Sequence, residues 1–249
     1  MFDVLLNGWP TLLDGSVMTL QLTFISVACS ALLSLPLAIL RRNSSLLLQW
    51  PIKLYVSFFR GTPLLAQLFL IYYGSGQFRP ELMELGLWWF FRDPFYCALL
   101  TFILNSTAYQ IEILRGGLQA VPRGEIEAAI AIGISGVRLY QKIILPHTYR
   151  IAFPALGNDV ILLLKGGAVA SVITVLDLMG STRRIFSQTF DISVYLWASV
   201  IYLLITIVFV FLWRCLELRL TRHIHTAKKA EGSIKAKIST CALERENVY

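Results

Sequence analysis

The sequence predicts an all-α protein that crosses a membrane several times. Hydrophobic residues make up 56% of its 249 residues and charged residues only 15%, against about 25% charged residues in typical soluble domains. A helix needs about 20 apolar residues to cross the hydrocarbon core of a bilayer, and it satisfies its backbone hydrogen bonds internally. Five runs fit this description, at about residues 17–40, 54–73, 95–114, 153–179 and 195–212.

The first predicted span, about residues 17–40, carries small polar side chains among its apolar residues. Such groups suit a face that packs closely against a neighbouring helix in the membrane. Arg41 and Arg42 mark its end. The polar residues are Thr19, Gln21, Thr23, Ser26, Ser30 and Ser34.

The second predicted span, about residues 54–73, is interrupted by the sequence Phe-Arg-Gly-Thr-Pro at residues 59–63. Thr62 and Pro63 have the residue types of an N-cap and a first helical residue. We therefore expect the span to be kinked or restarted there, with Arg60 near the cytoplasmic interface. A proline kink with a snorkelling arginine and a direct functional role for Arg60 both remain open.

The third predicted span, about residues 95–114, carries polar residues in its second half. Asn105, Tyr109 and Glu112 recur at helical spacing and share one face. A carboxylate at membrane depth is costly and usually faces a cavity or a partner. Two interpretations of Glu112 remain open: it lines a transport pathway, or it pairs with Arg115 near the cytoplasmic end.

Residues 120–150 have the pattern of a folded loop between two spans. The Ala-rich segment from Glu125 to Ile132 favours helix, and Gly133 can end that helix in the left-handed conformation. A second short amphipathic piece is expected from residue 135 to 144, ended by Pro146. The apolar side of this second piece should hold Val137, Tyr140, Ile143 and Ile144. In the first helix, the negative charge of Glu127 near the N-terminus would be stabilised by the helix dipole.

The fourth predicted span, about residues 153–179, is interrupted by polar and flexible residues. Asn158 and Lys165 lie seven residues apart and share a face, and Asp159 is next to Asn158. Gly166 and Gly167 allow local unwinding, which is tolerated where backbone lines a cavity or packs on protein. Lys165 needs a carboxylate or carbonyl partner at this depth, and Glu112 is a candidate.

The rest of the chain is expected to hold a loop, a fifth span and a tail. Residues 181–191 form the loop, and the span covers about residues 195–212. We assign residues 1–222 to one membrane domain. Residues 223–249 are basic and have little apolar periodicity, so they are expected to form a poorly ordered tail.

The distribution of basic residues predicts the orientation. Five spans place the two termini on opposite sides of the membrane. Arg and Lys concentrate around residues 41–42, in the 120–150 loop and in the tail, whereas residues 74–94 and 181–191 are nearly balanced in charge. Positive loops remain on the cytoplasmic side, which places the N-terminus outside and the 120–150 loop and the C-terminus in the cytoplasm.

The 120–150 loop resembles the EAA loop of bacterial ABC-importer permeases. That motif reads E-A-A, three residues, G, nine residues, then I-x-L-P, and this sequence matches it at residues 127–146. The resemblance implies that this loop docks into a cleft on an ATPase subunit. The matching residues assigned to this coupling role are Glu127, Ala128, Ala129, Gly133, Leu145 and Pro146.

The resemblance extends over most of the chain, to about residue 222. Residues 59–64, 72–78, 105–112, 158–165 and 177–180 look like the histidine/arginine branch of polar amino acid ABC permeases, with the M-type permeases of arginine importers most similar and opine permeases near relatives. This implies import of polar amino acids, arginine or other basic ones, across a bacterial inner membrane, with a periplasmic N-terminus. The implied partners are ATPase subunits, a homologous permease in a heterodimer, a periplasmic binding protein and membrane lipid.

The predicted substrate pathway lies among polar residues of the third and fourth spans. A cationic solute suits acidic groups there, and alternating access would move these spans around a cavity near the midplane when the coupling loop moves. The residues are Asn105, Tyr109, Glu112, Asn158, Asp159 and Lys165.

Two other functional classes fit the sequence less well, namely a secondary transporter and a membrane enzyme. The sequence contains no G-x-x-x-x-G-K-[ST] motif, so we expect ATP to be bound by partner subunits. A secondary transporter driven by an ion gradient would use Glu112, Asp159 and Lys165 as a proton relay, but it predicts inverted repeats that the sequence does not show. A membrane enzyme needs a catalytic cluster, which the separated His147, His223 and His225 do not form.

Neither metal, cofactor nor nucleic acid is expected. The four cysteines form no C-x-x-C pair and do not cluster with histidines, which argues against a zinc site or a disulfide framework. The net charge of +7 arises from residues at the ends of apolar runs and in the tail. This pattern indicates membrane orientation rather than a nucleic-acid surface.

Overall fold

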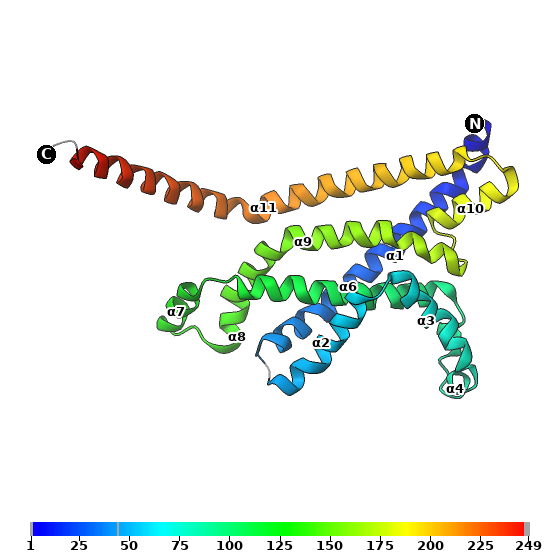
Figure 1. Ribbon diagram of the computed structural model, residues 1–249, viewed down its shortest axis with the longest axis horizontal. Coiled ribbons are helices and arrows are strands. Elements are labelled where there is room, and N and C mark those ends of the chain that lie inside the picture. The colour runs from blue at the N-terminus through cyan, green and yellow to red at the C-terminus, as the bar shows by residue number, and fades with distance from the viewer. Residues whose placement is uncertain (1, 44, 247–249) are drawn as a thin grey trace. The chain divides into compact units, whose positions relative to one another are not determined.

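The computed structural model describes the backbone of residues 2–43 and 45–246 and the side chains of residues 8–42 and 45–219. Within these residues the secondary structure is entirely helical, which confirms the predicted all-α class (Figure 1). The helices are α1 (Phe2–Asn43), α2 (Leu46–Gly61), α3 (Leu64–Gln77), α4 (Arg79–Glu84), α5 (Trp88–Phe91), α6 (Pro94–Gln119), α7 (Arg123–Ala131), α8 (Gly136–Leu139), the π-helical turn η1 (Tyr140–Ile144), α9 (Leu145–Gly166), the 3-10 helix η2 (Gly167–Ile173), α10 (Leu178–Thr189) and α11 (Ser193–Glu246).

Four helical segments of the described residues are long and apolar enough to cross a membrane. They are Gly8–Arg42, Pro94–Gln119, Gly136–Ile173 and Ser193–Arg219. The pair α2 and α3, bent by 106° at residues 62–63, makes a fifth when it is counted as one broken span. Each of the five predicted runs therefore overlaps a segment of this kind, with α2 and α3 counted as one span.

The chain divides into two units, Met1–Val208 and Phe209–Tyr249, and α11 contributes to both. The first unit holds α1 to α10 and the beginning of α11. The predicted tail, residues 223–249, lies outside the residues whose side chains are described, so its predicted disorder stays a prediction.

Helix α6 lies at the centre of the first unit, where it packs against α1, α2, α3, α5 and α9. The polar face of α1 is buried, as predicted, except that Gln21 is exposed. Ser30 Oγ donates a hydrogen bond to the carbonyl oxygen of Ile103 at 3.0 Å. Ser34 Oγ lies 3.2 Å from Oε1 of Gln110, which belongs to α6. Small hydroxyl groups therefore join the two long helices within the membrane region.

Two sequence-based boundaries in the second half of the chain were wrong. The fourth span begins at Gly136 and ends at Ile173, instead of covering residues 153–179. Residues 181–191 belong mostly to α10 rather than to a loop. Asp177 begins this helix, because its side chain accepts a hydrogen bond from the Gly180 N–H at 2.8 Å. The Gly166–Gly167 prediction holds in part: α-helix ends at Gly166 and the tighter 3-10 helix follows.

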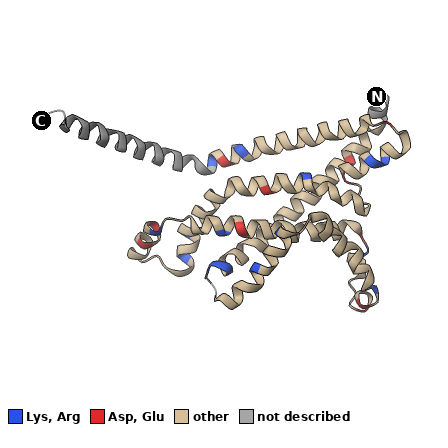
Figure 2. Cartoon of the chain, viewed as in Figure 1, with Lys and Arg blue, Asp and Glu red and all other residues tan. Residues whose placement is uncertain are grey.

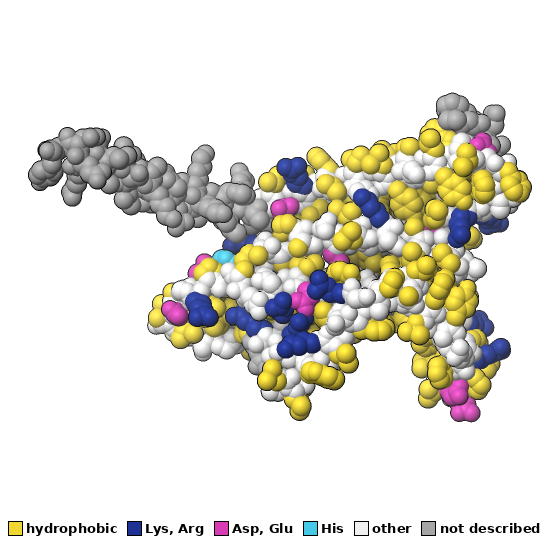
Figure 3. Space-filling model, in the orientation of Figure 1, with side chains coloured by type: hydrophobic (Ala, Val, Ile, Leu, Met, Phe, Trp, Pro, Cys, Tyr) yellow, Lys and Arg dark blue, Asp and Glu magenta, His cyan; other side chains and the backbone are white. Residues whose placement is uncertain are grey.

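Many large apolar side chains of the described residues are exposed, as a bilayer requires. Figure 3 shows hydrophobic side chains over much of the face in view. On α2 the first turns expose Leu46, Leu47, Leu48 and Trp50. A helix with such side chains at its start and a basic residue, Lys53, close by suits the membrane interface.

The close contact between α6 and α9 depends on Gly117. We therefore expect alanine substitutions at the adjacent Gly116 and Gly117 to have opposite effects on stability. A Cβ at Gly117 would lie 2.9 Å from the carbonyl oxygen of Thr148, whereas a Cβ at Gly116 meets nothing within 4 Å. We expect Gly117→Ala to destabilise the protein by about 1–3 kcal/mol through overpacking. Gly116→Ala should be neutral or stabilising, because alanine favours helix. Thermal unfolding in detergent measures both, and equal unfolding temperatures would contradict this close contact.

Candidate functional site

The loop between α6 and α9 folds as two short helices joined at Gly133. Helix α7 covers Arg123–Ala131, close to the predicted residues 125–132, and Gly133 has a φ of +84°. The Ile134 N–H donates to the carbonyl oxygen of Ala129 at 2.9 Å, and the Gly133 N–H to that of Ile130 at 2.9 Å. These bonds close the last turn of α7, as glycine in the left-handed region allows.

The second half of the loop differs from its prediction at Pro146. The short helix α8 continues through the π-helical turn η1 directly into α9, so Pro146 lies in the first turn of α9 and does not end the segment. A proline ring collides with the carbonyl oxygen of residue i−4 in a regular helix. The wider π turn just before it, in which the Leu145 N–H bonds to the carbonyl oxygen of Tyr140, relieves that collision.

The loop has a packed side and an exposed apolar side. Ala129, Leu139 and Ile144 are buried in a cluster with the end of α6. Ile132 and Val137 are 76% and 72% exposed. Val137 therefore does not lie on the buried side, contrary to the prediction. Exposed apolar groups gathered on one surface are typical of a protein interface.

The acidic residues of the loop have separate roles. Glu125, not Glu127, lies in the first turn of α7, and its Oε2 lies 3.1 Å from Nδ1 of His147 on α9. Glu127 and Ala128 are exposed. The predicted dipole role of Glu127 is therefore wrong, because it lies beyond the first turn, where that effect has faded. Its exposed position leaves its side chain open to a partner.

A cavity of about 200 Å³ lies between α3, α6 and α9. Three predicted pathway residues line it: Asn105, Tyr109 and Asp159. Its remaining walls are the apolar side chains of Leu64, Leu162 and Leu163. A largely apolar cavity with a few convergent polar groups is the usual form of a small-molecule site.

Asp159 is the acidic residue among those that line this cavity, and it is only 6% exposed. Its Oδ2 accepts hydrogen bonds from Ser106 Oγ at 2.8 Å and from Gln110 Nε2 at 3.4 Å. These bonds satisfy one carboxylate oxygen. Ser106 and Gln110 were not predicted as site residues, although their spacing of four residues places them on one face of α6.

Glu112 is part of an ion cluster at the end of α6 that leads into the loop. Its carboxylate pairs with Arg41 of α1 and with Arg115, whose Nε and Nη2 lie 2.9 and 2.8 Å from Oε2. Figure 2 shows basic residues around this end of α6 and on α2. Of the two interpretations, the structure displays the ion pair, and Glu112 is not among the residues that line the cavity.

Asn158 and Lys165 are exposed on a different face of α9 from Asp159. Among the ion pairs of the described residues, Glu112 is joined to Arg41 and Arg115 and not to Lys165. The candidate pair of Glu112 and Lys165 is therefore not formed. The helical period explains this, because residues 158 and 159 point about 100° apart on an α-helix.

The break between α2 and α3 lies beside the cavity. The predicted interruption is present, but Thr62 ends α2 and Pro63 precedes α3, so each cap is displaced by one residue from its prediction. Thr62 Oγ1 donates to the carbonyl oxygen of Phe58 at 2.8 Å instead of capping α3. The guanidinium of Arg60 lies 5.3 Å from the ring centre of Tyr109, in the cavity wall.

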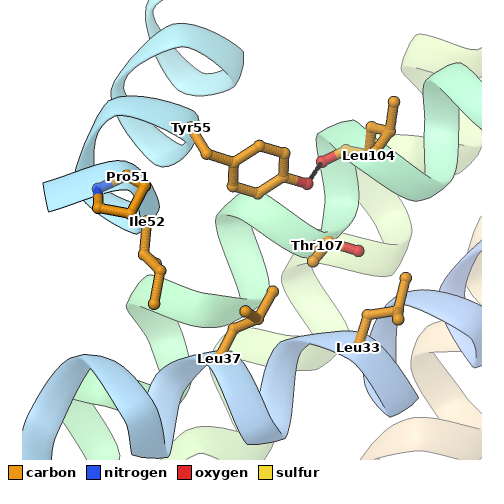
Figure 4. A pocket seen from close by; sticks show the side chains of 7 residues that line it. All are labelled: Leu33, Leu37, Pro51, Ile52, Tyr55, Leu104 and Thr107. Atoms are coloured by element: carbon orange, nitrogen blue, oxygen red, sulfur yellow. Dashed lines mark hydrogen bonds between the residues drawn. The ribbon is translucent and has the colours of Figure 1, made fainter. Parts of the chain in front are cut away.

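A second pocket, of about 320 Å³, lies between α1, α2 and α6 (Figure 4). Its lining is mostly apolar, and Tyr55 crosses it to donate a hydrogen bond to the carbonyl oxygen of Leu104 at 2.5 Å. This bond attaches α2 to α6 next to Asn105. The other lining residues are Leu33, Leu37, Pro51, Ile52 and Thr107.

Two transport-system permease proteins are similar to this chain in sequence. The nopaline transport system permease protein NocM of Agrobacterium fabrum is 42% identical over 207 residues, which cover 83% of this chain and 86% of that protein. The histidine/lysine/arginine/ornithine transport system permease protein HisM of Salmonella typhimurium is 39% identical over 234 residues, covering 90% and 99%.

Solved structures share the fold. The crystal structure of an amino acid ABC transporter with histidines has a TM-score of 0.77 and 34% identity, covering 88% of this chain and 98% of that chain. The MetNI methionine ABC transporter, at 18% identity and a TM-score of 0.71, shares the fold. Residues 18–225 match the family model described as binding-protein-dependent transport system inner membrane component, so this chain belongs to that family of membrane permeases.

Proposed function

We propose that this chain imports basic amino acids, arginine or a close relative, as a permease subunit of an ATP-binding-cassette importer. The observation that carries the choice of solute is the cavity that brings Asp159, Asn105 and Tyr109 together. A carboxylate, an amide and a phenol in an apolar cavity suit a solute with a positive charge and several hydrogen-bond donors. The similarity to a histidine/lysine/arginine/ornithine permease and to a nopaline permease supports this class.

The loop of α7, α8 and η1 transmits the movement of the ATPase subunit, driven by ATP hydrolysis, to this chain. Its exposed side chains, among them Glu127, Ala128, Ile132 and Val137, form the surface that an ATPase subunit would contact. Its buried side chains pack on the end of α6, and η1 continues into α9 without a break. A push on the loop would therefore move two helices that line the cavity, since packed elements switch between discrete arrangements. ATP itself is bound by the partner.

The complete importer contains this chain, a homologous permease, ATPase subunits and a periplasmic binding protein. The excess of Arg and Lys around residues 41–42 and in the loop supports a cytoplasmic loop and C-terminus and a periplasmic N-terminus. The outward end of the pathway would then receive the solute from the binding protein. A heterodimer of two related permeases is the arrangement that the family resemblance favours.

An ion-gradient-driven transporter is the rival hypothesis, with Glu112, Asp159 and Lys165 as a proton relay. The described hydrogen bonds and ion pairs do not join these three residues: Asp159 lines the cavity, Glu112 is bound by two arginines and Lys165 is exposed. A relay needs groups within hydrogen-bond reach of one another or of a water between them. The geometry therefore favours a passive pathway opened by a partner.

Uptake by the assembled importer in proteoliposomes tests the proposal. We expect labelled arginine to enter only when ATP is supplied to the ATPase subunits and the binding protein is present. Arginine should be preferred over citrulline, its neutral analogue, because citrulline lacks the charge that Asp159 attracts. Uptake that persists without the ATPase, driven by a proton gradient, would support the rival hypothesis instead. Equal uptake of arginine and citrulline would contradict the proposal that the solute is a basic amino acid.

A further inference from the structure

Gln67 joins the break between α2 and α3 to α6 through four hydrogen-bond contacts, three to the break and one to α6. It lies in the first turn of α3 and is only 2% exposed. Its Nε2 lies 2.8 Å from the carbonyl oxygen of Phe59, 3.0 Å from that of Thr62 and 2.8 Å from Thr62 Oγ1. Its Oε1 accepts a hydrogen bond from Nδ2 of Asn105 on α6 at 2.9 Å. One side chain thus contacts the end of α2 and the wall of the cavity.

The end of α2 needs such a partner. The last carbonyl groups of a helix have no donor within that helix, and an unpaired carbonyl in apolar surroundings is costly. After Gly61 the chain turns by 106°. The backbone N–H groups that would continue α2 and donate to these carbonyl groups therefore point elsewhere. The amide of Gln67 returns to the break and donates to the carbonyl oxygen of Phe59, in the last turn of α2, and to that of Thr62, which follows it.

Asn105 is oriented by the same contacts. Its Nδ2 donates to Gln67 Oε1 at 2.9 Å and lies 3.3 Å from the carbonyl oxygen of Phe59. An asparagine amide has two N–H donors and one carbonyl oxygen. Both donors are directed to the break, which leaves the carbonyl oxygen Oδ1 as the hydrogen-bonding atom available to the cavity that Asn105 lines.

We propose that Gln67 is a positioning residue for the transported solute, because it orients the Asn105 amide so that its oxygen faces donors of the solute. The identity of the solute in this inference is taken from the proposed function. Gln67 does not line the cavity itself and acts through Asn105. The cavity then presents two acceptors, Asn105 Oδ1 and the Asp159 carboxylate, to a cationic group. Without Gln67 the Asn105 amide can turn and offer its N–H groups to the solute instead.

The geometry allows Gln67 to be replaced without detaching α2 from α6. Tyr55 donates to the carbonyl oxygen of Leu104 (Figure 4), and Ile52 and Val56 of α2 are buried in a core cluster with residues of α6. Gln67→Met keeps the length of the side chain and removes its hydrogen bonds. Gln77→Met, on the same helix, is the matched control because Gln77 is exposed.

The transport test is a double-mutant cycle in the assembled importer. We expect Gln67→Met to raise the KM for arginine about tenfold or more, the loss of one hydrogen bond to a charged group, with kcat within about twofold of the parent. Asn105→Ala should have a similar effect, and the double variant should be no worse than Asn105→Ala alone, because Gln67 acts through Asn105. Effects that multiply in the double variant, or a change confined to kcat, would overturn the proposal.

A second measurement separates this inference from the choice of solute. Spin labels at Leu54 on α2 and Leu70 on α3, both exposed, report the distance across the break in the assembled importer without solute, after replacement of its native cysteines by alanine. Gln67→Met should broaden or shift the distance distribution, and Gln77→Met should leave it unchanged. If the importer takes up no basic amino acid, the proposed solute is wrong, yet this distance still tests Gln67. An unchanged distribution in Gln67→Met would show that Gln67 does not hold the break.

Discussion

Replacement of Asp159 by asparagine is expected to raise the KM for arginine uptake by about tenfold or more, which corresponds to about 1.4 kcal/mol of lost binding free energy. The carboxylate is buried in the cavity and already holds hydrogen bonds from Ser106 and Gln110. Asparagine has nearly the same shape but lacks the charge, so it removes the attraction for a cation while it leaves the packing unchanged. Uptake kinetics in proteoliposomes measure the effect.

The same variant should affect a neutral solute much less. We expect the KM for citrulline to change little, so that the preference for arginine over citrulline disappears. Asp14→Asn, which removes an exposed carboxylate from α1, serves as the control and should leave both values unchanged. An unaltered preference in Asp159→Asn would mean that the cationic group of the solute binds elsewhere.

Replacement of Gly133 by valine is expected to reduce ATP-driven uptake by about tenfold or more through loss of coupling. Gly133 has a φ of +84° and open space around its Cα, so the cost to valine is backbone strain and not collision. A left-handed residue costs about 1–2 kcal/mol for an ordinary side chain, and more for a β-branched one. The joint between α7 and α8 should therefore relax into another conformation and displace the docking surface.

Gly124→Val is the matched control for the loop. Gly124 lies in α7, its φ is outside the left-handed region, and a Cβ there meets nothing within 4 Å. It adds the same side chain to the same exposed loop without backbone strain. We expect this variant to keep most of its uptake and its stimulation of the ATPase, and the Gly133 variant to lose both. Full uptake by Gly133→Val would refute a coupling role for this joint.

Much of the fold follows from local patterns along the chain. Apolar runs of membrane length, the buried hydroxyl face from Thr19 to Ser34 and the left-handed Gly133 were predicted correctly, because each depends on residues within a few turns of one another. Helix α10 was missed because polar residues such as Arg183 and Arg184 obscure the apolar side made by Leu178 and Ile185. The prediction that Pro146 ends a helix was wrong because the π-helical turn before it leaves room for the proline ring. Such a turn is a backbone feature without a strong local sequence signal.

The candidate cavity was predictable only in part. The polar residues of α6 and α9 could be named from their types, but which of them meet depends on the rotation of each helix. Asp159 and Asn158 are neighbours in sequence, yet only Asp159 points inward. Glu112 was predicted either to line the pathway or to pair with Arg115, and the structure shows it paired with Arg115 and also with Arg41, a residue 71 positions away. Sequence spacing on one helix carries no information about such a distant partner.

The amino-acid order alone was sufficient to establish the helical membrane class and the left-handed turn at Gly133, because apolar length and glycine conformation are local properties. Tertiary packing decided which polar groups share a cavity, which are neutralised in ion pairs and how the broken span is held. Those outcomes depend on contacts between α2, α3, α6 and α9, where Gln67 satisfies the carbonyl groups left by the break and also orients Asn105. Buried polar groups must find partners, and only the folded chain determines which partners are within reach.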